Sequence, residues 1–182
     1  MSTTTRALSY ADLLETPDDG RRYEIVGGRL VVSASPRLKH QKLSLRLTDL
    51  LYELEKAGLG ELFEAPTDVE LGPNDIVVPD LVFVTAARLG ILGRQKIEGA
   101  PDILIEILSP STSDRDEGEK RDLYARSGVP EYWMIDAERD GVHALALVGG
   151  AYKPIPQNGG VVQSLVVPEF RVDVAALFAG LR

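Results

Sequence analysis

The first regular elements of the chain follow from simple alternation of polar and apolar residues. The segments 22–26 and 29–33 both alternate, and Gly27 and Gly28 lie between them. Both glycines accept the positive φ that a tight hairpin turn requires. The pattern therefore predicts an N-terminal β-hairpin.

After Pro36 the apolar residues take up the spacing of a helix. They form one stripe at intervals of three and four residues, and Gly58 and Gly60 follow it as helix-ending residues. The stripe consists of Leu43, Leu47, Leu50, Leu51 and Leu54. We therefore expect one long amphipathic helix after the hairpin.

Two later segments are continuous apolar runs that a single carboxylate interrupts. The first run covers residues 76–84 and contains Asp80, and the second covers residues 103–108 and contains Glu106. Both faces of the second run are apolar, which is typical of a central strand covered on both sides. We read the first run as one strand too, with Asp80 inside it.

The remaining pattern mixes strands with helices. A helix of roughly residues 117–127 carries Lys120, Leu123 and Tyr124 on one face. The other expected elements are a short helix over 10–14, strands over 62–64 or 67–71, a short helix and loop over 85–100, strands over 132–135, 142–148 and 161–167, and a final helix over 174–181. This mixture predicts a single α/β domain over residues 1–182, with a mixed central β-sheet flanked by helices and a core of about residues 10–178.

Composition narrows the chemistry that the chain can carry. The 182 residues fit one domain, and they include no cysteine and only two histidines, His40 and His143. Disulfides, thiolate metal sites and cysteine nucleophiles are therefore excluded, and an all-histidine zinc site has too few ligands. A site of oxygen ligands for a hard metal ion remains open.

Hydropathy and charge give two further expectations. The sequence has no apolar run long enough to span a membrane, and residues 1–7 lack the apolar core of a secretion signal, so we expect a cytoplasmic protein. The net charge of −8 argues against general affinity for polyanions, because that affinity comes from Lys and Arg. It counts against a nuclease unless a local basic patch or a metal ion overrides it.

Asp80 and Glu106 are the candidate metal ligands. An unpaired buried carboxylate must be neutralised, or compensated by a cation or by hydrogen-bond donors. Two of them on strands joined by a short connection suggest one shared ion, and Mg²⁺ or Mn²⁺ prefers carboxylate oxygens. Lys120 on the next helix could reach back to the end of the Glu106 strand and act on the attacking water. The set suits metal-assisted hydrolysis of phosphodiester bonds.

Each of these residues also has a structural explanation. A lone acid near a strand end can cap a turn or pair with an arginine. The stem of Lys120 can pack against the protein while its ammonium group reaches solvent. Two acids and a lysine together favour the catalytic interpretation.

Several short motifs occur together in this chain. They are Val78-Pro79-Asp80, Glu106-Ile107-Leu108-Ser109-Pro110-Ser111-Thr112, Lys120-Arg121-Asp122-Leu123-Tyr124, Gly128-Val129-Pro130-Glu131-Tyr132-Trp133 and the hairpin Tyr23-Glu24-Ile25-Val26-Gly27-Gly28, with His40 opening the long helix. Together they resemble the Uma-two family of putative restriction endonucleases, over about Tyr10 to Phe178. The resemblance implies a restriction-endonuclease-like fold of the PD-(D/E)xK nuclease superfamily, with Asp80 and Glu106 as the metal carboxylates.

The sequence departs from the superfamily pattern at one position. That pattern has a lysine two residues after the second acid, where this chain has Leu108. The resemblance implies that Lys120, on the following helix, has taken over the role of that lysine.

The roles of three further residues stay open. Glu24 could complete an acidic pocket or be an exposed strand acid, and His40 could be a core histidine or a site residue. We expect Tyr124 to pack in the core with its hydroxyl group near the site. Asp114 is expected to cap the helix rather than to bind metal.

The favoured function is a Mg²⁺-dependent endonuclease that acts on DNA. The alternatives are a non-catalytic binding or assembly protein on a nuclease-like scaffold, and a metal-dependent hydrolase of small phosphoesters, which would explain the acidic charge. We also expect a homodimer, since two sites would cut both strands of a duplex. Its apolar contact face is expected among Val142, Leu145, Leu147, Val161, Val162 and Val166.

Overall fold

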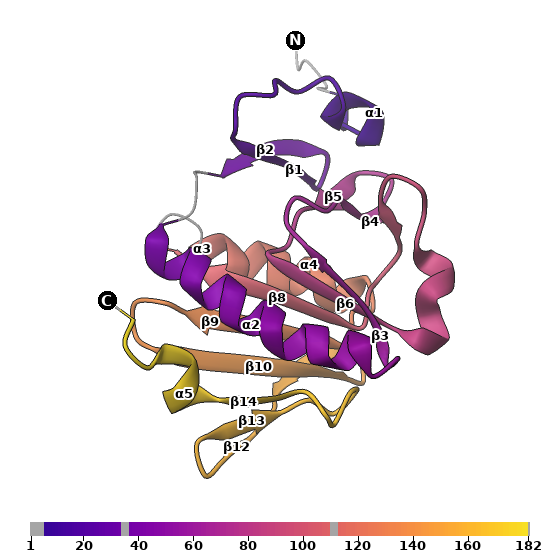
Figure 1. Cartoon of the computed structure of the whole chain (residues 1–182). Helices are drawn as coiled ribbons and strands as arrows, with labels where there is room; N and C mark the ends of the chain where they lie inside the picture. The colour runs from indigo at the N-terminus through magenta and orange to yellow at the C-terminus, as the bar shows by residue number, and fades with distance from the viewer. Residues whose placement is uncertain (1–5, 34–36, 110–112, 182) are drawn as a thin grey trace.

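A computed structural model describes residues 6–33, 37–109 and 113–181, without the side chain of Asp114. Residues 110–112 of one family motif and the expected helix cap at Asp114 therefore lie outside what the structure describes. The described chain folds into three β-sheets with helices packed against them (Figure 1).

The largest sheet has six strands and runs through the centre of the molecule (Figure 1). Its order is β11 (Ala151–Pro154), β10 (Gly141–Val148), β9 (Glu131–Asp136), β8 (Ile103–Leu108), β6 (Leu81–Thr85) and β3 (Gly60–Glu64). The β8–β9 pair is parallel, and the other four pairs are antiparallel. All six residues of β8 are buried, so the expected central strand and the expected mixed sheet are confirmed.

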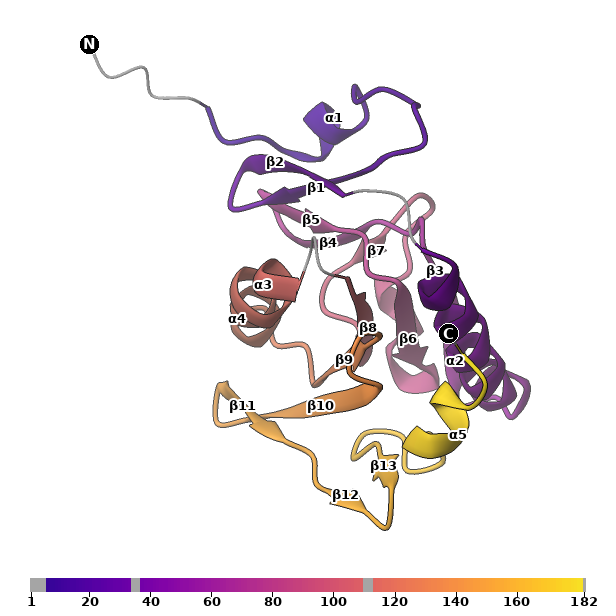
Figure 2. The ribbon, with the colours of Figure 1, turned by 90° about the vertical axis from the view of Figure 1, so that its left-hand side faces the viewer.

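Helices cover both faces of this sheet (Figure 2). On one face α2 (Leu38–Lys56) packs its leucines against Ile103, Ile105 and Ile107 of β8. On the other face lies a helical segment formed by α3 (Ser113–Arg115), the π-helical turn η2 (Asp116–Lys120) and α4 (Arg121–Arg126). Its residues Leu123 and Tyr124 pack against Leu104 and Leu108. The alternation of β8 thus separates the core into two layers.

The N-terminal hairpin belongs to a second sheet, which lies across one end of the first (Figure 2). Its order is β2 (Arg29–Ser33), β1 (Arg22–Val26), β5 (Asp75–Val77), β4 (Val69–Gly72) and β7 (Ile97–Glu98). Gly27 and Gly28 turn the hairpin with φ of 57° and 72°, as their positions predict. The short helix α1 (Tyr10–Leu13) packs on this sheet through Leu13.

The C-terminal part of the chain extends the core on the α2 side. It forms a small sheet of β12 (Gln157–Asn158), β13 (Val161–Gln163) and β14 (Arg171–Asp173), followed by α5 (Val174–Phe178). Phe170 packs against Trp133 of β9, with 4.8 Å between the ring centroids. A short 3₁₀ helix, η1 (Ala86–Ile91), follows β6 within the segment where a helix and loop were expected.

The apolar run over residues 76–84 is not one strand, and this part of the prediction is wrong. It divides into β5, which belongs to the second sheet, and β6, which belongs to the six-stranded sheet. Residues 78–80 form the crossing between the two sheets. Pro79 has no backbone N–H to donate to a neighbouring strand, so pairing stops there.

The ends of two elements and the exposed fraction of one leucine also differ from expectation. The strand expected over residues 161–167 ends at Gln163, because the next residues form a turn in which the Glu131 carboxylate accepts hydrogen bonds from the backbone N–H groups of Leu165 and Val166. The final helix ends at Phe178. Leu50 belongs to the predicted apolar stripe but is 39% exposed.

The residues expected to form a dimer face contribute mainly to the protein's own core. Val162 is buried, and Val142, Leu145 and Val166 pack against the two hydrophobic clusters. The homodimer therefore stays a prediction without a defined contact face. Among the described helices, none is long and apolar enough to cross a membrane.

Gly60 at the start of β3 is predicted to be intolerant of a side chain. A Cβ atom at this position would collide with the Val84 carbonyl oxygen and the Phe83 ring across the β3–β6 pair. We expect Gly60→Ala to lower the free energy of unfolding by about 1–3 kcal/mol in urea denaturation. Gly90→Ala is the control, because nothing lies within 4 Å of the added Cβ. Equal stability of the two variants would contradict this packing.

Candidate active site

Asp80 lies at the crossing between the two sheets, directly before β6. Since Leu81 pairs with Ile105, the crossing brings Asp80 alongside the end of β8. The backbone N–H of Ile107 donates a hydrogen bond to Asp80 Oδ2 at 2.8 Å. Of the two carboxylates predicted as metal ligands, Glu106 therefore stands on β8 and Asp80 on the crossing beside it.

Two basic side chains from different elements hold Asp80. Arg22 on β1 donates from Nη1 to Asp80 Oδ1 at 2.8 Å, and it also donates to the Val78 carbonyl oxygen at 3.3 Å. His40, in the first turn of α2, places Nε2 3.1 Å from Asp80 Oδ2. Burial by itself raises the pKa of Asp80, but the hydrogen bond and charge of His40 and the charge of Arg22 outweigh burial and lower the pKa below its usual value. Asp80 is therefore ionised at neutral pH.

Lys120 is the centre of a second group of charges. Its ammonium nitrogen lies 2.6 Å from Glu106 Oε1, 2.8 Å from Glu24 Oε1 and 4.0 Å from Asp116 Oδ1. The residue is 2% exposed. The alternative in which this ammonium group reaches solvent is therefore wrong.

The π-helical turn η2 positions Lys120. It begins at Asp116, so Asp116 and Lys120 stand four residues apart and both are buried. One turn further on, the Tyr124 hydroxyl group donates to Glu106 Oε1 at 2.8 Å. Single π-helical turns inside α-helices often mark functional sites. Here Lys120 at the end of the turn and Tyr124 in α4 both reach Glu106 on β8, and Asp116 lies beside Lys120.

Glu24 brings the hairpin into the site. It lies on β1 of the second sheet, is 1% exposed, and accepts a hydrogen bond from the Val78 backbone N–H at 2.9 Å. Glu24 therefore belongs to the acidic pocket and is not an exposed strand acid. Glu24 and Arg22 are two residues apart on one strand, so the same face of β1 contributes to both charge groups.

Negative charge exceeds positive charge in this region. Among the described residues, four buried carboxylates (Glu24, Asp80, Glu106 and Asp116) face the cations Lys120 and Arg22, with His40 beside them. Burial raises the pKa of Glu106, and the charges of Asp116, Asp80 and Glu24 raise it further, against the opposing effect of Lys120. Burial disfavours the charged form of Lys120, yet the charges of Glu106, Glu24 and Asp116 outweigh burial and raise its pKa. The centre can accept one more cation, or share a proton in its place.

The donor set suits a hard divalent ion, although the present contacts favour the protein's own cations. No group of three or more His, Asp or Glu side chains within the described ranges has the geometry of a ready metal site. The reason is that Lys120 and Arg22 already contact the carboxylates. Glu24 and Glu106 both use Oε1 for their contacts within the described part of the chain, and Oε2 is the oxygen left for an added ion.

A cleft of about 350 Å³ leads to Asp80 from the surface. Its walls include Arg22, His40, Gln41, Ser44, Glu64 and Asp80. Glu106 and Lys120 do not line it. Of the three predicted site residues, the cleft therefore reaches only Asp80.

The structure thus brings Lys120 into contact with Glu106, places Asp80 against the backbone of the next residue, Ile107, and adds further residues to the site. Arg22 and Asp116 were not predicted as site residues. Arg22 could have been predicted, because it shares a strand face with Glu24. His143 lies exposed on β10, outside the site. Leu108, where the superfamily pattern has lysine, is buried in the apolar layer.

Comparison with known proteins identifies relatives of the whole chain. A family model described as "Uma2: Putative restriction endonuclease" matches residues 10–175. Among solved structures, one match is a putative nuclease belonging to DUF820 from Anabaena variabilis ATCC 29413, with 19% sequence identity and a TM-score of 0.79. The match covers 96% of this chain and 99% of that chain, and it shows a common fold. A search of curated proteins found no significant match.

Lys120→Met is predicted to destabilise the protein strongly. The substitution keeps the length of the side chain but leaves Glu24, Glu106 and Asp116 without their buried cation. We expect a loss of about 3–5 kcal/mol in urea unfolding at pH 8, and a smaller loss at pH 5, where the carboxylates accept protons more readily.

Lys153→Met is the control for this prediction, because Lys153 is exposed on β11. It should change stability by less than about 0.5 kcal/mol. An unfolding curve for Lys120→Met that coincides with the wild type at both pH values would contradict the role of the ammonium group.

Proposed function

Since the chain belongs to the Uma2 family of putative restriction endonucleases, we propose that it is a divalent-metal-dependent endonuclease that hydrolyses phosphodiester bonds in DNA. The observation that carries the proposal is that Lys120 contacts Glu106 at 2.6 Å, while Asp80 accepts a hydrogen bond from the backbone N–H of Ile107, the residue after Glu106. This arrangement of two acids and a lysine corresponds to the site of the PD-(D/E)xK nucleases, with the lysine supplied by a helix.

Asp80 and Glu106 would hold the ion, Mg²⁺ or Mn²⁺. Their oxygens are the hard donors that these ions prefer, and the surplus of buried negative charge favours binding of a divalent cation. A bound ion lowers the pKa of the attacking water and neutralises charge that develops on the phosphate.

The other residues of the centre would assist the attacking water or orient the two carboxylates. The ammonium group of Lys120 would hold the attacking water or stabilise negative charge as it develops. His40 and the Ile107 N–H fix the orientation of Asp80, and the Tyr124 hydroxyl group fixes that of Glu106.

A local concentration of basic residues supports a nucleic-acid substrate in spite of the net charge. Residues 21–48 contain seven of the 20 Lys and Arg residues but only one of the 28 Asp and Glu residues, and that one is the buried Glu24. Of this segment, Arg22 of β1 and residues of the first half of α2 line the cleft at Asp80. Several other basic residues of the segment pair with acids from elsewhere in the chain, so the cation that a phosphate group would meet in the cleft is Arg22.

One observation favours the non-catalytic alternative. Arg22 and Lys120 already neutralise two of the carboxylates without any metal, as they would in a structural ion-pair network. Titration with metal separates the two functions, because a purely structural network does not bind Mg²⁺ or Mn²⁺.

Arg22 is predicted to compete with the metal for Asp80. Its guanidinium group is 26% exposed and can leave the carboxylate without unfolding the strand. In calorimetric titration with Mn²⁺, we expect Arg22→Ala to raise affinity by about fivefold and Asp80→Asn to abolish binding. Arg88→Ala is a matched control, since Arg88 pairs with the buried Asp102 outside the site at 2.9 Å. An unchanged affinity of Arg22→Ala would contradict the competition.

Metal-dependent cleavage is the direct test of the proposed function. Purified protein at low ionic strength should nick or cut supercoiled, linear or single-stranded DNA with Mg²⁺ or Mn²⁺, and should not cut in EDTA. Asp80→Asn and Glu106→Gln should each abolish cleavage. Lys120→Ala should lower the cleavage rate on the order of 10²-fold or more, the usual contribution of general acid–base catalysis.

The control for the acid substitutions is Asp102→Asn, which changes an equally buried acid away from the centre. It should retain cleavage at temperatures where circular dichroism shows that it is folded. Cleavage that survives both site substitutions would indicate a contaminating nuclease. Metal binding without cleavage of any of these DNAs would refute the endonuclease proposal.

A further inference from the structure

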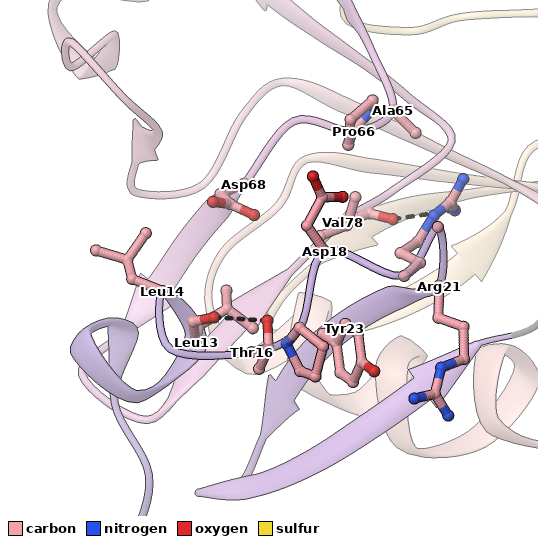
Figure 3. A pocket seen from close by; sticks show the side chains of 13 residues that line it. Leu13, Leu14, Thr16, Asp18, Arg21, Tyr23, Ala65, Pro66, Asp68 and Val78 are labelled. Carbon is pink, nitrogen blue, oxygen red and sulfur yellow. Dashed lines mark hydrogen bonds between the residues drawn. The ribbon is translucent and has the colours of Figure 1, made fainter.

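A second cavity adjoins the cleft at Asp80 and has no part in the proposed chemistry. Its volume is about 520 Å³, and it lies between the segment that joins α1 to β1 and the chain around Ala65 and Asp68 (Figure 3). Arg22 and Ala65 line both cavities. The cavity and the cleft therefore meet at Arg22, which also donates hydrogen bonds to Asp80 and to the Val78 carbonyl oxygen.

The wall of this cavity combines an apolar surface with two acids. Leu14, which is 60% exposed, belongs to the apolar part, together with Pro66 and Val78. Figure 3 shows the carboxylates of Asp18 and Asp68 between the leucine side and the Ala65–Pro66 side. Arg22 stands where the cavity meets the cleft, and Arg21, which pairs with Asp19, also lines the cavity. The lining thus combines guanidinium groups, an apolar wall and hydrogen-bond acceptors.

This combination matches one nucleotide unit of a strand. A phosphate group fits beside a guanidinium group, and a base fits an apolar wall that has polar groups at its edge. Carboxylates accept hydrogen bonds from base amino groups, such as N4 of cytosine, whereas thymine offers carbonyl oxygens at that edge. The cavity is large enough for a base with its sugar.

A base can reach this cavity only when it is unstacked. In a duplex the bases are paired and stacked inside the helix, and proteins bind them in pockets only from single strands or after extrusion. The groups beyond Arg22 are recessed as well, since Asp80 and Glu106 are both 4% exposed. A flexible single strand can follow such a path more closely than a stiff duplex can.

We infer that this cavity binds the nucleotide next to the scissile phosphate of a single-stranded nucleic acid, with the base amino group at Asp18 and Asp68. The inference deepens the proposed function and rests on it only for the position of the scissile phosphate at Asp80. It names the substrate class as single strands, or single-stranded regions, whose bases carry amino groups.

Equilibrium binding without cleavage tests the inference. Fluorescence anisotropy would be measured in EDTA at low ionic strength, with gels to show that the strands stay intact. The probes are labelled 12-nucleotide oligo(dC) and oligo(dT), and a mixed-sequence 12-mer as a single strand and as a duplex. We expect the single strand to bind about 10-fold tighter than its duplex, and oligo(dC) tighter than oligo(dT).

Two exposed leucines provide matched variants for the location of the site. Leu14→Ser should weaken single-strand binding by about fivefold, since it removes part of the apolar wall. Leu165→Ser should leave binding unchanged, because Leu165 is similarly exposed, at 63%, but does not line the cavity. Asp18→Asn should reduce the preference for oligo(dC) over oligo(dT).

Several results would overturn the inference. They are equal or tighter binding of the duplex, equal affinity for oligo(dC) and oligo(dT), or unchanged binding by Leu14→Ser. The proposed function survives these results if the protein cuts duplex DNA with Mg²⁺. Single-strand binding as expected, without metal-dependent cleavage, would uphold the binding of a nucleotide in this cavity and refute the proposed function.

Discussion

The buried ammonium group of Lys120 is the constraint on which the site depends. It lies within 2.8 Å of carboxylates from β1 and β8, two strands that belong to different sheets. Removing three charged groups from water costs several kcal/mol for each, and mutual pairing is the compensation. The hairpin sheet, the central sheet and the helix after β8 are thereby held in one relative position. That position is the geometry that the proposed hydrolysis needs.

The crossing at Pro79 and Asp80 likewise joins several elements, at the end of the site that the surface cleft reaches. The chain leaves the second sheet there and enters the central sheet. Asp80 therefore has hydrogen-bond partners from three elements: Arg22 from β1, His40 from α2 and the Ile107 N–H from β8. The break in pairing at Pro79 thus places Asp80 where these three elements come together.

Charge is distributed unevenly along the chain, and this distribution would reconcile an acidic protein with the proposed anionic substrate. Residues 21–48 are basic, and the excess of acids lies in the rest of the chain. Acids from elsewhere in the chain pair with several of these basic residues, and Arg22 of the segment lines the cleft. Attraction of a phosphate group would then be local, since salt screens charges over about 10 Å at ordinary ionic strength.

The sequence by itself determined the elements whose patterns are local. The hairpin at Gly27 and Gly28, the leucine stripe of α2 and the two-sided apolar strand around Glu106 depend on residues a few positions apart, and propensity and periodicity report these directly. The acids Asp80 and Glu106 were conspicuous for the same reason, since each interrupts an apolar run. Lys120 followed from its place on the inward face of a helix.

Only the tertiary structure decided which distant residues meet. The apolar run around Asp80 reads as one strand, and its division between two sheets depends on pairing with β1 and β8, which no local pattern encodes. Arg22 and Glu24 enter the site because the hairpin packs against the end of the central sheet. Burial then set the ionisation of Glu106 and Lys120, since the desolvation of a charge depends on everything packed around it.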